Sequence, residues 1–187
     1  MEKIGFTGDH HFGHANIICY DHRLYSTVQE MDADLIARWN ETVALGDIVY
    51  HLGDIFLYKR VEDARAARKQ LNGTIRLIHG NHDQVADALK NGFDWIRDYY
   101  ALKVPDPDAY GGKQLLVLCR YAFRVWNRSH HGLFHLYDHS HGSLPDDPHA
   151  LSFDVGCMLF DYKPISYEQV KERMATKDWQ PVDHHQG

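Results

Sequence analysis

The sequence predicts an α/β fold in which helices cover a parallel or mixed β-sheet. In the first half of the chain, an apolar strand, a polar loop and a helix follow one another three times, and this alternation is typical of such sheets. The second half is rich in short apolar strands. The 187 residues, of which 44% are hydrophobic and 25% charged, suffice for one hydrophobic core. We therefore expect a single domain over residues 1–187.

Each element of the first half has a local signal. Residues 3–7 form a short apolar strand, and Thr27 with Glu30 is a capping-box pattern that begins a helix over 28–43. A strand is expected at 48–52, followed by a helix at 60–71. A strand at 74–78 comes next, and a short helix then extends to about residue 90. The loops that follow the three strands lie at carboxyl ends, where such sheets bind ligands.

The second half predicts five strands, a helix and a terminal segment. The strands are expected at residues 95–104, 114–119, 133–137, 151–155 and 157–162. The helix is expected at 166–174 and the terminal segment at 178–187. The strands over 151–155 and 157–162 are expected to pair with each other. Ser166, with Glu168 in the first turn, begins the helix, and residues 178–187 are expected to form a loose tail.

The composition argues against several classes of protein. With 20 Lys and Arg against 26 Asp and Glu, the formal net charge is −6, whereas non-specific nucleic-acid binding normally uses a basic face. Cys19, Cys119 and Cys157 lie far apart and form no CxxC pair, which indicates a reducing compartment. The sequence shows no signal peptide and no long apolar stretch. We therefore expect a cytoplasmic protein with no membrane partner.

Histidine is unusually frequent, with 15 in 187 residues. Ten of them form three clusters, at residues 10, 11 and 14, at 79 and 82, and at 130, 131, 135, 139 and 141. Histidine, aspartate and asparagine at strand ends are typical metal ligands, and imidazole with carboxylate suits manganese, iron, nickel or zinc. A site for two metals needs a shared carboxylate and ligands from several loops, which these segments can supply.

Four motifs carry a family resemblance. In chain order they are Asp9-His10-His11 (DxH), Gly53-Asp54 (GD), Gly80-Asn81-His82-Asp83 (GNHD) and His139-Ser140-His141 (HxH). With these motifs in this order, the chain resembles the calcineurin-like metallophosphoesterases of the small bacterial and phage type, from about Lys3 to Lys177. The resemblance implies two packed mixed β-sheets flanked by helices, with a two-metal site at one edge.

The resemblance also implies a set of metal ligands. Asp9, His11 and His141 would hold one divalent ion, and Asp54 would bridge to a second. The second ion would also take Asn81 and His139. Manganese is the favoured metal.

The same resemblance implies the reaction. Metal-bound hydroxide would attack a phosphodiester or phosphomonoester, and His82 would bind phosphate or protonate the leaving oxygen. Asp83 would be a catalytic partner that orients His82. The expected substrate is a small-molecule or nucleotide phosphoester, although nucleic-acid ends and phosphoproteins also fit. The sequence indicates neither the substrate nor the oligomeric state.

Two positions depart from the family pattern. Arg120, in the segment Leu118–Ala122, stands where the family has a histidine ligand of the second metal, and Asp138 replaces the glycine of a GHxH motif. Arginine has no lone pair to offer a metal. A guanidinium about 5 Å from a divalent ion would cost about 6 kcal/mol at an effective dielectric constant near 20. The resemblance is therefore weakest at the second metal.

Four interpretations of Arg120 are open. The side chain could replace the second metal's charge and clamp the phosphate, or the second metal could be weak or missing. The side chain could also point outward, with His130 or His131 as the substitute ligand. Finally, the chain could be a catalytically inactive relative that binds a phosphate-containing ligand. A compromised second site is the preferred interpretation, and Asp138 is either an added carboxylate or a turn residue.

The remaining histidines are expected to have other roles. His10, His14 and His79 fit packing or hydrogen bonding to ligands better than metal binding. His135 alternates with apolar residues in a strand, so a core or surface position is expected.

Overall fold

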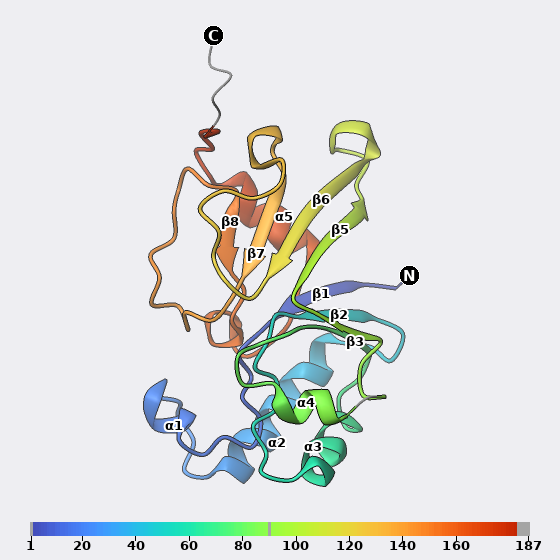
Figure 1. Ribbon diagram of the computed structural model, residues 1–187, viewed down its shortest axis with the longest axis vertical. Coiled ribbons are helices and arrows are strands. Elements are labelled where there is room, and N and C mark those ends of the chain that lie inside the picture. The colour runs from blue at the N-terminus through green and yellow to red at the C-terminus, as the bar shows by residue number, and fades with distance from the viewer. Residues whose placement is uncertain (1, 90, 183–187) are drawn as a thin grey trace.

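The computed structural model describes residues 2–89 and 91–182. It contains two β-sheets that pack on each other, with helices on the outside (Figure 1). The first sheet has the order β4-β3-β2-β1-β9 and the second the order β5-β6-β7-β8. Both sheets are mixed, because β9 and β5 each run antiparallel to their neighbours. The expected pair of mixed sheets flanked by helices is confirmed.

The bounds of the elements follow. The strands are β1 Ile4–Thr7, β2 Ile48–His51, β3 Thr74–Ile78, β4 Trp95–Arg97, β5 Tyr99–Pro105, β6 Lys113–Cys119, β7 Phe134–Tyr137, β8 Ser152–Asp154 and β9 Ile165–Ser166. The α-helices are α1 Ile17–Tyr20, α2 Val28–Thr42, α3 Val61–Arg68, α4 Gln84–Ala88 and α5 Tyr167–Ala175. Short 3₁₀ segments cover Tyr110–Gly112, Ser129–His131 and Cys157–Phe160.

Helix α2 begins where the sequence predicts. The hydroxyl of Thr27 accepts a hydrogen bond from the backbone N–H of Glu30 at 3.1 Å, and this satisfies a free amide of the first turn. Met31, Leu35 and Trp39 follow at helical spacing and are fully buried. Together with α3 and α4, this face covers one side of the first sheet (Figure 1).

The core between the sheets is built from alternating strand residues. Phe6 and Tyr50 from the first sheet meet Leu116, Leu136 and Phe153 from the second, and all five are almost fully buried. Helix α5 closes one end of this core with apolar side chains. Its first turn has a capping box between Ser166 and Gln169.

The expected strand over 95–104 is wrong in one respect. It is two strands that break at Asp98, because β4 pairs with β3 in the first sheet and β5 pairs with β6 in the second. The apolar pattern continues across the break, since both strands face the same core. The chain thus changes sheets without a change in local sequence character.

The expected strand pair at 151–155 and 157–162 is also wrong. Strand β8 pairs in parallel with β7, and the following Cys157–Phe160 is a 3₁₀ turn. The backbone N–H of Cys157 donates to the carbonyl oxygen of Gly8 at 2.9 Å, so this segment continues toward the end of β1. Helix α1 and strand β9 had no sequence prediction, and both are very short.

The expected loose tail is partly described. The backbone N–H of Gln180 donates to the carbonyl oxygen of His149 at 3.0 Å. Residues 183–187, and with them His184 and His185, lie outside the described residues. Among the helices within residues 2–89 and 91–182, none is long and apolar enough to cross a membrane.

The topology brings the motif residues to one edge. Strands β1, β2 and β3 are parallel neighbours, so their carboxyl ends lie side by side and lead into Asp9, Asp54 and Asn81. Strands β6 and β7 are likewise parallel and lead into Arg120 and Asp138. Both sheets therefore contribute loops to the same region.

Candidate metal centre

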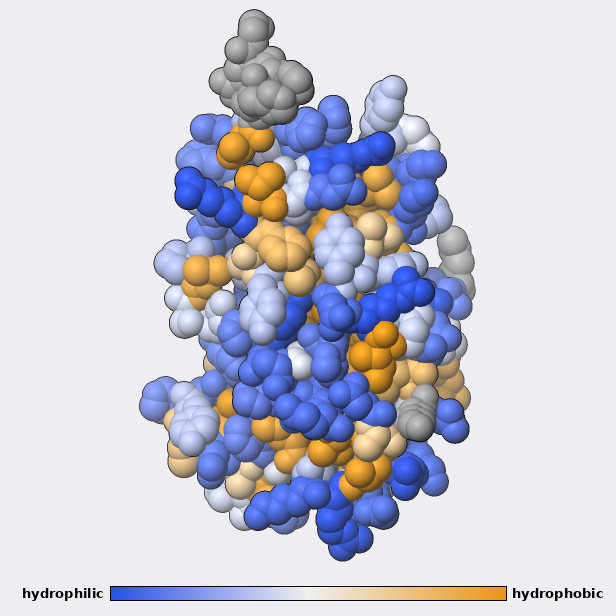
Figure 2. Space-filling view, viewed as in Figure 1, coloured by the Kyte–Doolittle hydropathy of each residue, from blue (hydrophilic) through white to orange (hydrophobic). Residues whose placement is uncertain are grey.

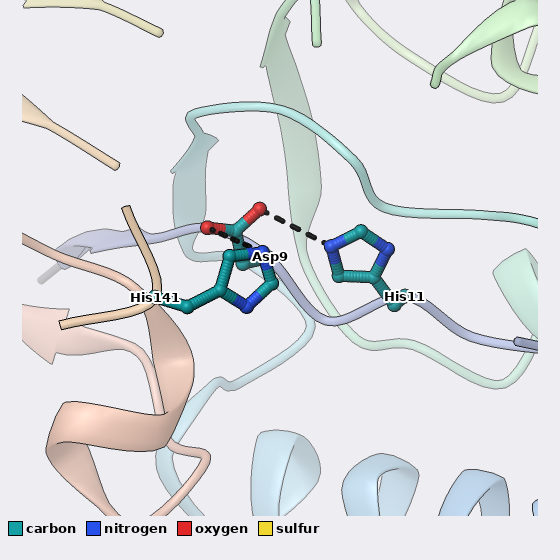
Figure 3. Close-up of side chains that lie close together, drawn as sticks. All are labelled: Asp9, His11 and His141. Carbon is teal, nitrogen blue, oxygen red and sulfur yellow. Dashed lines mark ion pairs between the residues drawn. The ribbon is translucent and has the colours of Figure 1, made fainter. Parts of the chain in front are cut away.

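Asp9, His11 and His141 form a cluster of metal-ligand type. One carboxylate oxygen of Asp9 lies 3.3 Å from Nε2 of His11, and the other lies 3.6 Å from Nε2 of His141. One ligand atom from each residue falls within 4.8 Å of the others. Figure 3 shows the Asp9 carboxylate between the two imidazole rings, which come from the loop after β1 and the loop between β7 and β8.

The backbone at these residues is unusual. Asp9, His11 and His141 have φ values of 53°, 55° and 47°, and Asp54 and His139 have 54° and 80°. Left-handed conformations at residues other than glycine are uncommon, and they gather at functional sites where the surrounding structure enforces them. Five of the six expected metal ligands adopt this conformation.

Hydrogen bonds between loops enforce this backbone. The amide of Asp9 donates to the carbonyl oxygen of Gly53 at 3.1 Å, and the amide of His11 donates to that of Asp54 at 3.0 Å. The backbone N–H of His139 donates to Oδ2 of Asp9 at 3.0 Å. The loops after β1, β2 and β7 are therefore joined directly beside the cluster.

The two histidines differ in their hydrogen bonds. Nδ1 of His141 donates to Oδ2 of Asp21 at 2.9 Å, which leaves Nε2 with its lone pair toward Asp9. A carboxylate behind a histidine is the usual arrangement at metal sites, since it fixes the tautomer and the ring orientation. The ring nitrogens of His11 are buried and have no hydrogen-bond partner among the described residues. A role as a metal ligand explains why a buried ring nitrogen has no hydrogen-bond partner.

Charge in the cluster supports an ionised carboxylate. Burial favours the neutral form of Asp9, but the His11 ring 3.3 Å away and the charge of Arg120 hold the pKa of Asp9 well below its usual range. Burial disfavours the protonated ring of His141, whereas the hydrogen bond with Asp21 and the charge of Asp9 raise its pKa. The ionised Asp9 carboxylate, with the ligand atoms of His11 and His141 within 4.8 Å, fits one divalent ion.

Asp21 and Arg23 support this cluster and had no sequence signal. The guanidinium of Arg23 is buried and donates to Oδ2 of Asp21 at 3.0 Å and to the carbonyl oxygens of Asp9 and His10 at 2.9 and 2.8 Å. It thereby holds the DxH segment and the carboxylate behind His141 in place. Neither residue belongs to a motif, and only the tertiary structure identifies them.

Arg120 points inward, and its side chain is 3% exposed. Nη1 donates to Oδ1 of Asp9 at 2.7 Å and to Asp138, while Nη2 donates to Asp54 and lies 3.3 Å from Oδ1 of Asn81. The interpretation with an outward side chain is therefore wrong. Two of the expected ligands of a second ion, Asp54 and Asn81, bind the guanidinium instead, so these side chains do not fit a second metal.

The remaining expected ligand, His139, lies at the surface. Its ring meets Tyr121 edge-on at a centroid distance of 4.9 Å. Within the described residues, the ring makes no hydrogen bond to Asp54 or Asn81. The structure thus joins Asn81 and Asp54 through Arg120, whereas the His139 ring packs against Tyr121.

His82 and Asp83 have separate roles. His82 is exposed, its ring centroid lies 6.4 Å from that of His11, and its backbone N–H donates to Oδ1 of Asp54 at 2.8 Å. Asp83 is fully buried and accepts from the amides of Gly80, Asp54 and Ile55 at 2.8 to 3.0 Å. Burial raises the pKa of Asp83. Its contacts hold the Asp54 loop, and its carboxylate does not orient the His82 ring.

A cavity of about 940 Å³ opens beside the cluster. Its lining includes His14, Tyr20, His82, His139 and His141. None of its described lining residues is lysine or arginine. Figure 2 shows hydrophilic side chains gathered across the middle of the face that is turned toward the viewer in Figure 1, between the second sheet and helices α2 to α4. The cavity is thus an opening lined by histidine and tyrosine side chains, without lysine or arginine among the described lining residues.

Three other histidines lie outside the lining of this cavity. His10 is fully buried, stacks on Phe12 and lies 3.0 Å from His51 between ring nitrogens. His79 is partly exposed and pairs with Asp87. His135 is fully buried in β7 and is hydrogen-bonded to backbone groups.

Comparisons with known proteins show the family of this chain. The family model described as calcineurin-like phosphoesterase matches residues 2–187. An uncharacterized protein of Methanocaldococcus jannaschii is 34% identical over 176 residues, which cover 91% of this chain and 90% of that protein. The Gene 66 protein of Mycobacterium phage D29 is 29% identical over 166 residues, which cover 77% and 81%.

One solved structure supports the fold. A protein of unknown function from Aquifex aeolicus superposes with a TM-score of 0.67 at 20% identity. The match covers 92% of this chain and 100% of that chain.

Proposed function

Because this chain belongs to the calcineurin-like phosphoesterase family, we propose that it is a metal-dependent hydrolase of phosphodiesters. The observation that carries the proposal is the cluster of Asp9, His11 and His141, which fits a divalent ion and opens on a cavity lined by further histidines. Manganese is the proposed metal, because imidazole and carboxylate ligands suit it. When bound, such an ion polarises a phosphoryl oxygen and lowers the pKa of water.

The chain's own residues then have distinct tasks. Asp9 and His11 come from one loop that backbone hydrogen bonds join to the next loop, and Asp21 fixes the ring of His141, so the ligands are in place before the metal binds. His82 lies on the cavity wall near His11. We assign it the transfer of a proton to the leaving oxygen, since an exposed imidazole beside the cavity can reach a bound ester.

The cavity favours a substrate of low charge. A phosphodiester has one negative charge per phosphate, whereas a terminal phosphate or a polyphosphate has more. The described lining has no lysine or arginine to neutralise additional charge. Tyr20 is 68% exposed at this cavity and offers a surface on which a base or another ring can stack. We therefore propose a phosphodiester with an aromatic or nucleoside group, and a phosphomonoester as the poorer substrate.

The experiment compares hydrolysis of an aryl phosphodiester and an aryl phosphomonoester with added manganese and after chelation. We expect turnover only with metal and faster turnover of the diester. His82→Ala should lower kcat by about 10²- to 10⁴-fold and leave the metal content unchanged. His79→Ala is the matched control, because His79 lies outside the lining of this cavity. Equal rates for His82→Ala and the parent chain would contradict the proposal.

A second candidate function is phosphate-ester binding without turnover. The position of Arg120 favours it, because the guanidinium binds Asp54 and Asn81 in place of a second metal. In this case a phosphodiester would bind at the metal-loaded cavity in a calorimeter, and neither ester would be hydrolysed. Hydrolysis that depends on His82 would eliminate this candidate.

The compartment and partners complete the proposal. Cys19, Cys119 and Cys157 are free thiols, which supports a reducing, cytoplasmic location. The acidic composition supports a small-molecule or nucleotide ester as the partner rather than non-specific binding of nucleic acid.

A further inference from the structure

We propose, on the basis of the function proposed above, that Arg120 is a built-in cation that replaces the second metal, so that the chain holds a single divalent ion. The ion would be bound by Asp9, His11 and His141. The Arg120 guanidinium would bind the side-chain oxygens of Asp54 and Asn81 in place of a second ion.

The oxygen atoms around Arg120 are those that a divalent ion would use. Carboxylate and amide oxygens from Asp9, Asp54 and Asn81 come from three separate loops and converge on one point. Convergent oxygens of this kind bind hard divalent cations. Here the guanidinium lies at that point and donates to all three side chains. A second ion would have to displace a buried cation from three hydrogen-bonded partners.

The guanidinium has no donor left for substrate. Arginine has five N–H groups, and five contacts to side-chain oxygens account for them. Nη1 binds Asp9 and Asp138, Nη2 binds Asp54 and Asn81, and Nε lies 3.4 Å from Oδ1 of Asn81. A phosphate clamp needs two free N–H groups on one edge. Arg120 therefore holds protein ligands and does not clamp the phosphate.

Asp138 is part of the same arrangement of side chains around Arg120. It follows β7 as Arg120 follows β6, and its backbone N–H donates to the carbonyl oxygen of Arg120 at 3.2 Å. Its side chain is fully buried and forms an ion pair with Nη1. The departure of Asp138 from the glycine of the family motif is thus explained by the departure at Arg120.

Two glycines make room for this pair. A Cβ at Gly8 would lie 1.5 Å from Oδ2 of Asp138, and a Cβ at Gly53 would lie 2.9 Å from Cδ of Arg120. The space around both side chains is therefore filled by the backbone of the loops after β1 and β2. A larger side chain at either glycine would collide with the Arg120–Asp138 pair.

The replacement changes the charge that faces a substrate. A guanidinium carries one positive charge, whereas a divalent ion carries two. It is also permanently charged and cannot be removed by a chelator. A phosphate in the cavity would therefore meet less positive charge than at a site with two metals. This agrees with a substrate that has only one charge per phosphate.

The test is the number of manganese ions bound per chain, measured by elemental analysis after equilibrium dialysis. Electron paramagnetic resonance then distinguishes an isolated ion from a spin-coupled pair. We expect one isolated ion in the parent chain and none in His11→Ala. The double variant Arg120→His with Asp138→Gly should bind a second, spin-coupled ion. Arg124→His is the matched control, because Arg124 is exposed, and it should still bind one ion.

Each other outcome overturns the proposal. Two ions or none in the parent chain would contradict a single metal with a built-in cation. One ion that persists in His11→Ala would place the metal elsewhere. One ion in the folded double variant would show that Arg120 is not what excludes the second. The number of manganese ions bound by the parent chain tests the proposal even if the double variant does not fold. Hydrolysis is measured separately, so a chain with one ion and no turnover would refute the proposed function alone.

Discussion

Arg120 and Asp138 lie opposite each other at the ends of the parallel strands β6 and β7, and a buried ion pair joins their side chains. The pairing of Leu118 with Leu136 sets this register two residues earlier. A buried charge without its partner is strongly destabilising. The two departures from the family motif are therefore a single structural feature, an arginine with its counter-ion.

The packing of Gly8 against Asp138 provides the first prediction. Gly8→Ala should lower the free energy of unfolding by about 1–3 kcal/mol, which is typical of an overpacked core. The reason is the collision of the new Cβ with Oδ2 of Asp138. In an Asp138→Gly background the same change should cost much less. Urea denaturation of the four proteins gives this coupling.

Gly5→Ala is the control for that cycle. Gly5 also lies in the β1 region, but the nearest atom to its Cβ position is 3.5 Å away, which is an ordinary contact. We expect a small effect in both backgrounds. If Gly8→Ala cost the same with and without Asp138, the packing described here would be wrong.

The carboxylate behind His141 provides the second prediction. Asp21→Ala should weaken manganese binding by about 10- to 100-fold, the usual effect of losing such a partner. The ring of His141 would no longer be held through Nδ1. Calorimetric titration measures the affinity. Asp34→Ala is the control, because Asp34 is likewise bound by an arginine, Arg38, but lies away from the cluster. Unchanged affinity in Asp21→Ala would refute the role of Asp21.

The buried ring of His135 provides a prediction for pH. Burial lowers the pKa of His135 to about 4, compared with about 6.5 in an unfolded chain. The unfolded chain therefore binds a proton first as the pH falls. The contribution of the neutral His135 ring to the free energy of unfolding is complete above pH 6.5. It is lost between pH 6.5 and 4, with about 2 kcal/mol lost at pH 5.

The measurement compares the parent chain with His135→Gln, which cannot titrate at this position. Urea denaturation at pH 7.5 and pH 5 should show that the parent chain loses about 2 kcal/mol more than the variant. His149→Gln, at a partly exposed histidine, should behave like the parent. Equal losses in His135→Gln and the parent would contradict the prediction. An NMR titration of the His135 ring gives an independent value.

The sequence predicted most of the elements that position the site. Strands β1 to β3 and helix α2 have strong local signals, because apolar runs and a cap involve neighbouring residues. The break at Asp98 and the 3₁₀ turn after Gly156 could not be predicted in this way. Both depend on which strand the segment pairs with, and those partners lie far along the chain.

By itself, the sequence determined that aspartate, histidine and asparagine side chains follow the strand ends, since these motifs consist of a few adjacent residues. Only the tertiary structure decided the direction of Arg120. Its partners are 111, 66, 39 and 18 residues away at Asp9, Asp54, Asn81 and Asp138. A guanidinium buries itself only where several acceptors converge. That convergence is a property of the packed sheets and of no local segment.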